Sequence, residues 1–235
     1  MLRKTIRFMD SAVNRIVAIL CLLLFLICLY AMIDAVNVYL NANDKSVLKY
    51  KPQLGHGSEV LGELSDDAVA WLTIDNTSID YPVMQGRNNE EYINKDPFGE
   101  FSLSGSIFLD SRNRADFSDP YSILYGHHME HGAMFGALDE FLERSYFEEH
   151  RNGMLMVTNG KSYRIELFAC VEADGAVGEI FAPNETGGPL NYVREHAAIW
   201  HEPEDGQLIA LSTCKFPETS ERIIVFGVLY EDELE

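Results

Sequence analysis

The feature that most constrains this chain is an uninterrupted apolar segment near its N-terminus. Residues 16–33 read IVAILCLLLFLICLYAMI, 18 residues without a charge. A helix of about 20 such residues, at a rise of 1.5 Å per residue, crosses the hydrocarbon core of a bilayer. We therefore expect one membrane-spanning helix here and one folded domain in the rest of the chain.

A cleavable signal peptide is the main alternative for this segment. The apolar region of a signal peptide is usually shorter, about 7–15 residues, and small residues mark its cleavage site. No Ala-x-Ala pattern follows here, and Met32, Ile33 and Asp34 are poor substitutes. We therefore favour an anchor that is not cleaved.

The charges before the segment indicate its orientation. The first 15 residues hold four basic residues against a single acidic one, Asp10. Such a bias keeps the N-terminus in the cytoplasm. We expect a single-pass protein of the cell membrane whose folded domain lies on the extracellular face. The expected parts are a cytoplasmic tail (1–15), a transmembrane signal-anchor (16–33), an extracytoplasmic stalk with some helix (34–60) and the folded domain (61–235).

The composition supports a packed domain and excludes one class of partner. Hydrophobic residues make up 47% of the chain, which is enough for a real core. The formal net charge is -19, and no cluster of Lys and Arg suited to phosphate binding is visible. We therefore expect no nucleic acid partner.

The pattern beyond residue 74 predicts a mostly β fold. Short apolar runs alternate with turn residues such as Gly, Asn, Asp and Pro. The runs cover residues 79–84, 105–109, 122–125, 154–158, 162–171, 207–212 and 222–230. Helical spacing is found at residues 59–72, 134–149 and 190–200, and Ser65 followed by two Asp residues resembles a helix start. We predict a mostly antiparallel β-barrel with added helices.

The four cysteines lie in different surroundings. Cys21 and Cys28 are inside the apolar segment, where a thiol is simply compatible with the membrane. Cys170 is flanked by apolar residues, as expected for a small buried hydrophobe. Cys214 follows the apolar run 208–211 at the point where the chain becomes charged, so a strand would hold it rigidly and still expose its thiol. A free cysteine is most often a small buried hydrophobe, and that remains the alternative to a functional thiol at Cys214. We expect no disulfide between Cys214 and Cys170.

A second predicted strand ends in Tyr125-Gly126-His127-His128. A thiolate nucleophile needs a partner that favours its charged form and a group that protonates the leaving amine. Histidine can do both near neutral pH. A lone histidine is more often a satisfied polar group, but two histidines directly after a strand and a glycine favour a site. His127 and Cys214 are 87 residues apart, so only the fold could bring them together.

Arg222 opens the last apolar run, eight residues after Cys214. If Cys214 ends one strand and Arg222 begins its neighbour, a hairpin places the two side by side. A guanidinium stays charged and presents several donors, so it can stabilise an oxyanion or orient a carbonyl group. Taken alone, Arg222 is better explained as an ordinary exposed charge at the start of a strand.

Together these residues resemble the sortase family of cysteine transpeptidases. Leu211-Ser212-Thr213-Cys214 resembles the family's cysteine segment, Tyr125-Gly126-His127 resembles its histidine segment, and Arg222 stands where its arginine is found. The likeness covers residues 60–232, and the segments 105–110, 126–135 and 190–200 are most similar to class B sortases. The resemblance implies a sortase-like closed β-barrel.

The resemblance also implies a mechanism. Cys214 would attack the carbonyl group of a Thr in a C-terminal sorting signal, and a thioacyl enzyme would form. His127 would protonate the departing amine and later deprotonate the incoming one. Arg222 would hold the substrate backbone and the developing oxyanion. Tyr125, Ser212 and Thr213 would line the substrate pocket.

The partners follow from the same resemblance. They are exported proteins that bear a sorting signal and, as acceptor, an amine of peptidoglycan, with a pilin lysine as the alternative in polymerising members. No metal or other cofactor is expected. Lys215 follows the cysteine where some class B members carry an acidic residue, so no particular sorting motif is carried over.

Two other functions compete with this hypothesis. Residues 127–131 match H-x-x-E-H, the inverted zinc-peptidase pattern. That pattern requires a continuous helix, which Gly126 and Gly132 on either side disfavour. A binding module in a sortase-like shell without catalytic activity is the second alternative, and it predicts an unreactive Cys214.

Overall fold

A computed structural model describes residues 2–42, 45–52, 64–183, 188–215 and 219–232. The chain forms two compact units, residues 1–41 and 42–235. We consider each of them separately.

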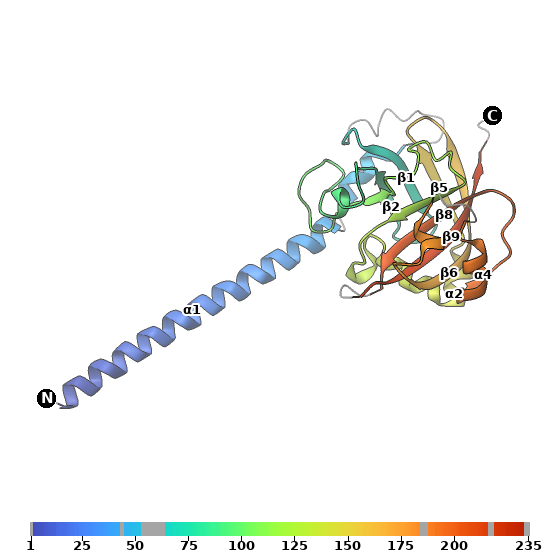
Figure 1. Ribbon diagram of the computed structural model, residues 1–235. Coiled ribbons are helices and arrows are strands. Elements are labelled where there is room, and N and C mark those ends of the chain that lie inside the picture. Colours follow the sequence, from blue (N-terminus) through green and yellow to red (C-terminus); the bar gives the residue numbers. More distant parts are fainter. Residues whose placement is uncertain (1, 43–44, 53–63, 184–187, 216–218, 233–235) are drawn as a thin grey trace. The chain divides into compact units, whose positions relative to one another are not determined.

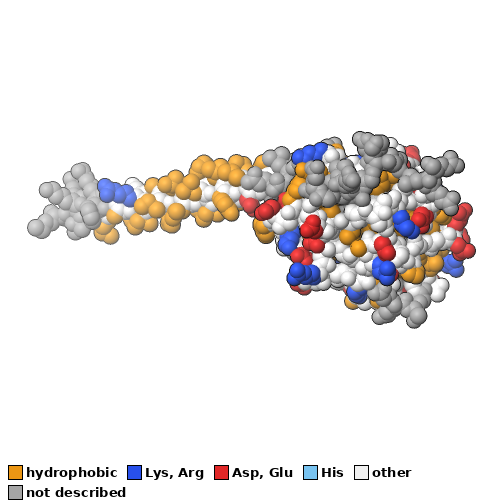
Figure 2. Space-filling view, turned by 90° about the horizontal axis from the view of Figure 1, so that it is seen from above, with side chains coloured by type: hydrophobic (Ala, Val, Ile, Leu, Met, Phe, Trp, Pro, Cys, Tyr) orange, Lys and Arg blue, Asp and Glu red, His pale blue; other side chains and the backbone are white. Residues whose placement is uncertain are grey.

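The first unit is a single long helix, α1 (Leu2–Ala42). Its stretch Met9–Val36 contains an 18-residue window with a mean hydropathy of 3.2, and none of that window is buried within the protein. Figure 2 shows hydrophobic side chains along its surface. The helix is therefore long and apolar enough to cross a membrane, and it extends beyond the predicted span of residues 16–33 at both ends.

The second unit is a closed β-barrel (Figure 1). The described residues form the strands β1 (Ala68–Ile74), β2 (Asp80–Met84), β3 (Ile107–Leu109), β4 (Tyr121–Tyr125), β5 (Asn152–Val157), β6 (Ser162–Asp174), β7 (Ile199–Trp200), β8 (Gln207–Cys214) and β9 (Glu221–Glu231). They pair in the order β5-β1-β2-β3-β4-β8-β9-β6-β7, and pairing of β5 with β6 closes the ring and leaves β7 on the outside. Among the strands of the described residues, only the pairs β2–β3 and β4–β8 are parallel, so the predicted mostly antiparallel barrel is confirmed.

Short helices decorate the barrel. They are η1 (Lys45–Tyr50), η3 (Glu91–Ile93), η4 (Glu130–Gly132), η5 (Gly136–Leu142), α2 (Arg144–Glu149), α3 (Gly178–Phe181) and α4 (Leu190–His196). The helical spacing predicted at 134–149 corresponds to η5 and α2, which Glu143 separates because its backbone is extended.

Strands β8 and β9 are buried on both faces. Residues such as Ile209, Leu211 and Val225 point into the barrel core, whereas Ala210 and Phe226 belong to a second cluster outside it. That outer cluster is covered by residues of α3 and α4. Burial on both faces explains why these strands read as continuous apolar runs.

Two helix predictions were wrong in part. Residues 68–72, the end of the helix predicted at 59–72, belong to β1, and Ser65 precedes a turn instead of a helix. The apolar residues of β1 are buried on both faces, and periodicity alone does not separate such a strand from a helix. In the stretch 190–200 the helix ends at His196, because Ile199–Trp200 pairs with β6 as an edge strand.

The predicted stalk (34–60) contains the end of α1 and the helix η1. Its residues 43–44 and 53–60 lie outside the described part of the chain.

Candidate active site

Cys214 and Arg222 face each other across a hairpin. Strand β8 ends at Cys214, strand β9 begins at Glu221, and their antiparallel register places Cys214 directly opposite Arg222. The amide of Lys215 donates to the carbonyl oxygen of Glu221 at 2.9 Å and extends the pairing by one bond. The hairpin predicted from the spacing of the two residues is confirmed.

The parallel pairing of β4 and β8 brings the histidine segment to the same end of the barrel. Tyr125 pairs with Ser212, the amide of Gly126 donates to the carbonyl oxygen of Ser212 at 3.2 Å, and the Thr213 hydroxyl donates to the carbonyl oxygen of Gly126 at 2.9 Å. His127 and Cys214 each lie two residues beyond the Tyr125–Ser212 pair. Residues 87 positions apart in the chain thus line one site.

Close packing requires a glycine before His127. A Cβ atom on Gly126 would come within 2.8 Å of the Phe135 ring and would collide with the side chain of Ile107. The glycine lets β4 end tightly against these side chains, and it therefore sets where His127 emerges.

The imidazole of His127 has one defined partner. Its Nε2 donates to the carbonyl oxygen of Ile93 at 2.8 Å. A carbonyl oxygen only accepts, so Nε2 carries a proton and Nδ1 is the nitrogen that can exchange a proton with a ligand.

Gly105 in turn fixes the carbonyl group of Ile93. Its φ is +60°, and a Cβ atom there would collide with the Ile93 carbonyl oxygen and lie 2.7 Å from that of Tyr92. Only a glycine allows this approach without strain.

A pocket of about 310 Å³ lies at this end of the barrel. All six residues that the sequence singles out for the site line it, namely Tyr125, His127, Ser212, Thr213, Cys214 and Arg222. The remaining lining residues are Asn89, Ile93, Phe108, Arg112, Gly126, Gly175 and Phe181. Its walls are mainly apolar and aromatic, as is usual for a ligand site with a few placed polar groups.

The three predicted substrate-binding residues present different groups. The Tyr125 hydroxyl donates to Asp110 at 2.9 Å, so the ring is the part of Tyr125 available to a ligand. Burial, followed by the charge of Asp110, raises the pKa of Tyr125, which keeps the hydroxyl protonated. The Thr213 hydroxyl is bonded to Gly126. The Ser212 Oγ is buried and has no hydrogen-bond partner within the described part of the chain.

Two basic side chains, Lys215 and Arg222, lie next to Cys214. The Lys215 ammonium lies 2.9 Å from Glu172 and 4.0 Å from Glu221. The hydrogen bond with Glu172 raises the pKa of Lys215, so the lysine stays charged next to Cys214. One guanidinium nitrogen of Arg222 lies 3.4 Å from the carbonyl oxygens of Thr219 and Glu221, which are long hydrogen bonds.

The second cysteine of the barrel lies in a different environment. Cys170 is fully buried in β6, and burial raises the pKa of its thiol to about 12. Like Cys214, it forms no disulfide.

The H-x-x-E-H segment does not form the helix that a zinc peptidase needs. His131 has φ = 59°, outside the helical region, and His128 forms an isolated bridge with Met134. The ring of His128 is bonded to Asp139 at 2.7 Å. Among the described residues, no group of three or more His, Cys, Asp or Glu is arranged to hold a metal ion.

Sequence reasoning missed half of the pocket. Asn89 and Ile93 come from the segment between β2 and β3, and Gly175 and Phe181 follow β6. None of them has a local signal of its own, because a single Asn, Ile, Gly or Phe in a loop is common. The pairing of Asp110 with Arg112 could have been noticed as an acid and a base directly after a strand.

Comparison with known proteins decides the family. A family model described as the sortase domain matches residues 72–230. The chain belongs to the sortase family. The sequence of this sortase is 31% identical to sortase B of Staphylococcus aureus over 176 residues, which cover 71% of this chain and 72% of that protein.

Solved structures agree with this assignment. A Streptococcus pyogenes class B sortase involved in pilus biogenesis superposes with a TM-score of 0.66 at 37% identity, covering 76% of this chain and all of that one. A complex of S. aureus sortase B with its substrate gives a TM-score of 0.69 at 26% identity, covering 83% of this chain and 94% of that one. This sortase is most similar to class B members, and it is a cysteine transpeptidase with their barrel fold.

Proposed function

We propose that this sortase cleaves a C-terminal sorting signal after its Thr residue and transfers the protein to an amine of peptidoglycan. The observation that supports it most directly is the meeting of Cys214, His127 and Arg222 at one pocket. Three aromatic residues, Phe108, Tyr125 and Phe181, line the same pocket.

In the first half of the reaction Cys214 is the nucleophile. Its sulfur attacks the carbonyl carbon of the Thr, the C–N bond to the next residue breaks, and a thioacyl enzyme forms. The departing amine takes a proton from His127. The bond from Nε2 to Ile93 supports this role, since it leaves Nδ1 to handle that proton.

In the second half an incoming amine attacks the thioacyl carbon. His127 accepts its proton, the new amide bond forms, and the Cys214 thiolate departs. Arg222 donates to the oxyanion that develops in both halves. The long bonds of Arg222 to Thr219 and Glu221 support this, because a substrate oxygen can replace them at little cost.

Tyr125, Ser212 and Thr213 complete the proposed site as substrate-binding residues. Ser212 lines the pocket, and its buried hydroxyl has no hydrogen-bond partner in the described part of the chain, so it can bind the signal if the side chain turns toward the pocket. Tyr125 contributes its ring face to an apolar side chain of the signal. Thr213 affects the substrate mainly through its hydrogen bond to Gly126, which fixes the end of the strand that precedes His127.

We further propose that α1 anchors the enzyme in the cell membrane, with the barrel on the extracellular face. Its apolar surface from Met9 to Val36 supports a membrane span, and the basic residues before it support a cytoplasmic N-terminus. An exported substrate and a lipid-linked acceptor both arrive at that face.

Attachment to the cell wall is the favoured outcome, and pilus assembly is the second candidate. Pilus assembly remains a candidate because the chain is similar, at 37% identity, to a class B sortase involved in pilus biogenesis. The two differ in the acceptor, which is a cross-bridge amine in one case and a pilin lysine in the other.

The test uses the full chain in detergent micelles, mixed with a library of sorting-signal peptides. Intact-mass spectrometry should detect a thioacyl adduct on Cys214 that is absent in Cys214→Ala, present in Cys170→Ala and unaffected by a metal chelator. Supplying a cross-bridge peptide or a lysine-bearing pilin peptide then identifies the acceptor. No adduct with any peptide would reject the proposal, and chelator-sensitive cleavage would favour a metallopeptidase.

A further inference from the structure

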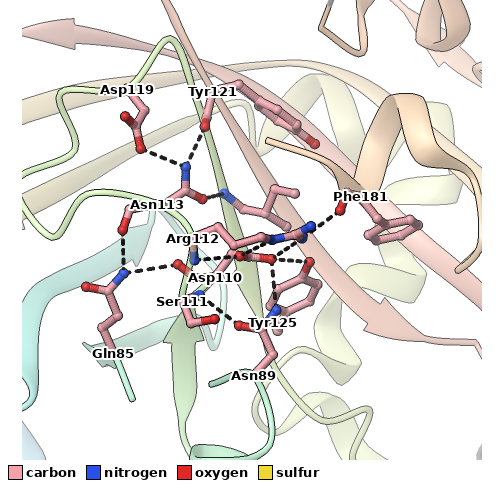
Figure 3. Close-up of polar contacts among 11 residues, drawn as sticks. Gln85, Asn89, Asp110, Ser111, Arg112, Asn113, Asp119, Tyr121, Tyr125 and Phe181 are labelled. Carbon is pink, nitrogen blue, oxygen red and sulfur yellow. Dashed lines mark hydrogen bonds and ion pairs between the residues drawn. The ribbon is translucent and has the colours of Figure 1, made fainter. Parts of the chain in front are cut away.

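Behind the pocket lies a buried carboxylate that accepts an unusual number of hydrogen bonds. Asp110 follows β3 and is fully buried. Arg112 binds both of its oxygens, at 2.9 Å through Nε and 2.7 Å through Nη2, and the Arg112 amide adds a bond of 2.9 Å. Asn89 and Tyr125 each donate to it at 2.9 Å (Figure 3). Burial alone would raise the pKa of Asp110, but these hydrogen bonds outweigh it and the pKa is lowered, so the group is ionised.

Arg112 also reaches a segment that is distant in the chain. The same Nη2 donates to the carbonyl oxygen of Phe181 at 2.6 Å, across 69 residues. Figure 3 shows the guanidinium between the carboxylate of Asp110 and that carbonyl group. The Phe181 ring stacks on Tyr125, with centroids 6.5 Å apart and planes at 19°. Arg112 therefore links the end of α3 to the ends of β3 and β4.

The segment that Arg112 holds forms one wall of the pocket. It runs from Asp174, at the end of β6, to Phe181 at the end of α3, and both Gly175 and Phe181 line the pocket. Its first end is fixed beside the hairpin, because the Gly175 amide donates to the Ser220 carbonyl oxygen at 2.8 Å. Ser220 also donates to Asp174.

The wall lies directly against a residue of the proposed catalytic set. A Cβ atom on Gly175 would be 3.6 Å from Nε of Arg222, which is ordinary contact distance. One end of the wall thus lies beside Arg222 and the other is bound by Arg112. A shift of the Phe181 end would widen the space in which a peptide lies.

We propose that Arg112 is a positioning residue, which holds the wall from residue 174 to residue 181 against the barrel so that a bound sorting signal is kept on Cys214. The inference rests on the proposed transpeptidation for its effect on catalysis. Asp110 fixes the guanidinium from behind, and the carbonyl group of Phe181 is the contact through which Arg112 acts.

A lysine at position 112 could not make the same set of contacts. The Arg112 guanidinium binds two carboxylate oxygens and one carbonyl oxygen at fixed angles, whereas an ammonium is a point charge on a flexible stem. We therefore expect Arg112→Lys to keep the charge balance with Asp110 and to lose the contact with Phe181. This variant therefore tests whether the contact between Arg112 and Phe181 matters, or only the positive charge beside Asp110.

The experiment measures the mobility of the wall and the rate of the reaction separately, in the full-length enzyme in detergent micelles. Hydrogen exchange of peptides covering residues 175–183 is compared in the wild type, Arg112→Gln, Arg112→Lys and Arg114→Gln. Arg114 is a matched control, because its side chain is exposed, binds Asp116 and Ser118, and does not line the pocket. We expect exchange to be faster by about tenfold in both Arg112 variants and unchanged in Arg114→Gln.

Kinetics then test the link to catalysis. For a sorting-signal peptide we expect KM to rise about tenfold in the Arg112 variants with kcat changed less than about threefold, because binding is lost and the reacting groups are kept. Alkylation of Cys214 by a small reagent should proceed at the wild-type rate, which a general loss of structure would not allow. Combining Arg112→Gln with Phe181→Ala should raise KM no further than the larger single effect, since both act through one contact.

The outcomes separate this inference from the proposed function. Unchanged exchange at residues 175–183 in a folded Arg112 variant overturns the inference that Arg112 holds the wall, even if the enzyme is active. Faster exchange with an unchanged KM, or additive effects of the two substitutions, overturns the positioning role. A wild-type enzyme that turns over no peptide rejects the proposed function, and the exchange measurement still decides whether Arg112 holds the wall.

Discussion

The hydroxyl of Thr213 donates a hydrogen bond to the carbonyl oxygen of Gly126 at 2.9 Å, and so joins the strand end that carries the cysteine to the one that carries the histidine. Thr213 is the residue before Cys214, and Gly126 is the residue before His127. The relative position of the two proposed catalytic groups therefore depends on this bond as well as on the β4–β8 pairing.

Removing that bond should lower activity more than stability. Thr213→Val keeps the shape of the side chain and removes the donor, which should cost about 1 kcal/mol of unfolding free energy. We expect kcat/KM for a sorting-signal peptide to fall by about tenfold, because a small displacement of a catalytic group is costly. Thr213→Ser retains the hydroxyl and should stay within about twofold of the wild type. Equal activity in the Val and Ser variants would show that the bond does not position the site.

Gly105→Ala should disturb the orientation of the His127 ring, although Gly105 does not contact that ring. A Cβ atom at Gly105 would collide with the carbonyl oxygen of Ile93, to which Nε2 of His127 donates. We expect kcat/KM to fall by about tenfold or more as His127 loses its fixed orientation.

Gly99→Ala is the control for this prediction. Gly99 also has a positive φ, +86°, but a Cβ atom there would meet nothing within 4 Å. Each substitution should cost about 1–2 kcal/mol through backbone strain, measured by denaturant unfolding, and Gly105→Ala should cost more than Gly99→Ala because its Cβ atom also collides with the Ile93 carbonyl oxygen. Only Gly105→Ala should lower activity strongly, and similar activities of the two variants would contradict the role of the Ile93 carbonyl group.

The two cysteines of the barrel should differ sharply in reactivity. Cys170 is fully buried and its thiol has a pKa raised to about 12, whereas Cys214 lines the pocket. In a Cys21→Ser, Cys28→Ser background at pH 7.5, iodoacetamide should label Cys214 alone while the protein is folded. In guanidinium chloride both should be labelled. Labelling of Cys170 in the native protein at a rate comparable to Cys214 would contradict the packing of β6.

The buried Asp110 should contribute to stability in a pH-dependent way. Its pKa lies below the ordinary value of 3.8, so the stabilisation is complete above that value and is lost as the pH falls through the lower pKa of the folded state. Asp110→Asn should cost about 3 kcal/mol near pH 7, because it leaves Arg112 without its charged partner. The variant should also lose part of the acid sensitivity of the wild type.

Asp116→Asn is the matched control for Asp110→Asn. Asp116 pairs with Arg114 on the surface at 3.4 Å, and such exposed pairs contribute about 0–1 kcal/mol. Denaturant unfolding of the two variants at pH 7 and pH 3 measures the difference. Equal stability losses would mean that the buried ion pair does not stabilise the barrel end.

The core strands were predictable because their signal is local. Runs such as 207–212 and 222–230 are apolar over their whole length, and the structure buries β8 and β9 on both faces. The same property makes the prediction at residues 68–72 wrong: the apolar spacing there fits a helix, but the residues form a strand that is buried on both faces. Local periodicity does not contain the information that separates the two.

The sequence by itself determined the long apolar helix, most of the barrel strands and the three residues of the proposed catalytic set. Each of these depends on neighbours in the chain, or, for Cys214 and Arg222, on a hairpin short enough to foresee. Only the tertiary structure decided which residues wall the pocket. Arg112 and Phe181 are 69 residues apart, and His127 and Ile93 are 34 apart. Their contacts exist because the barrel packs distant loops onto one end, and no local pattern encodes such packing.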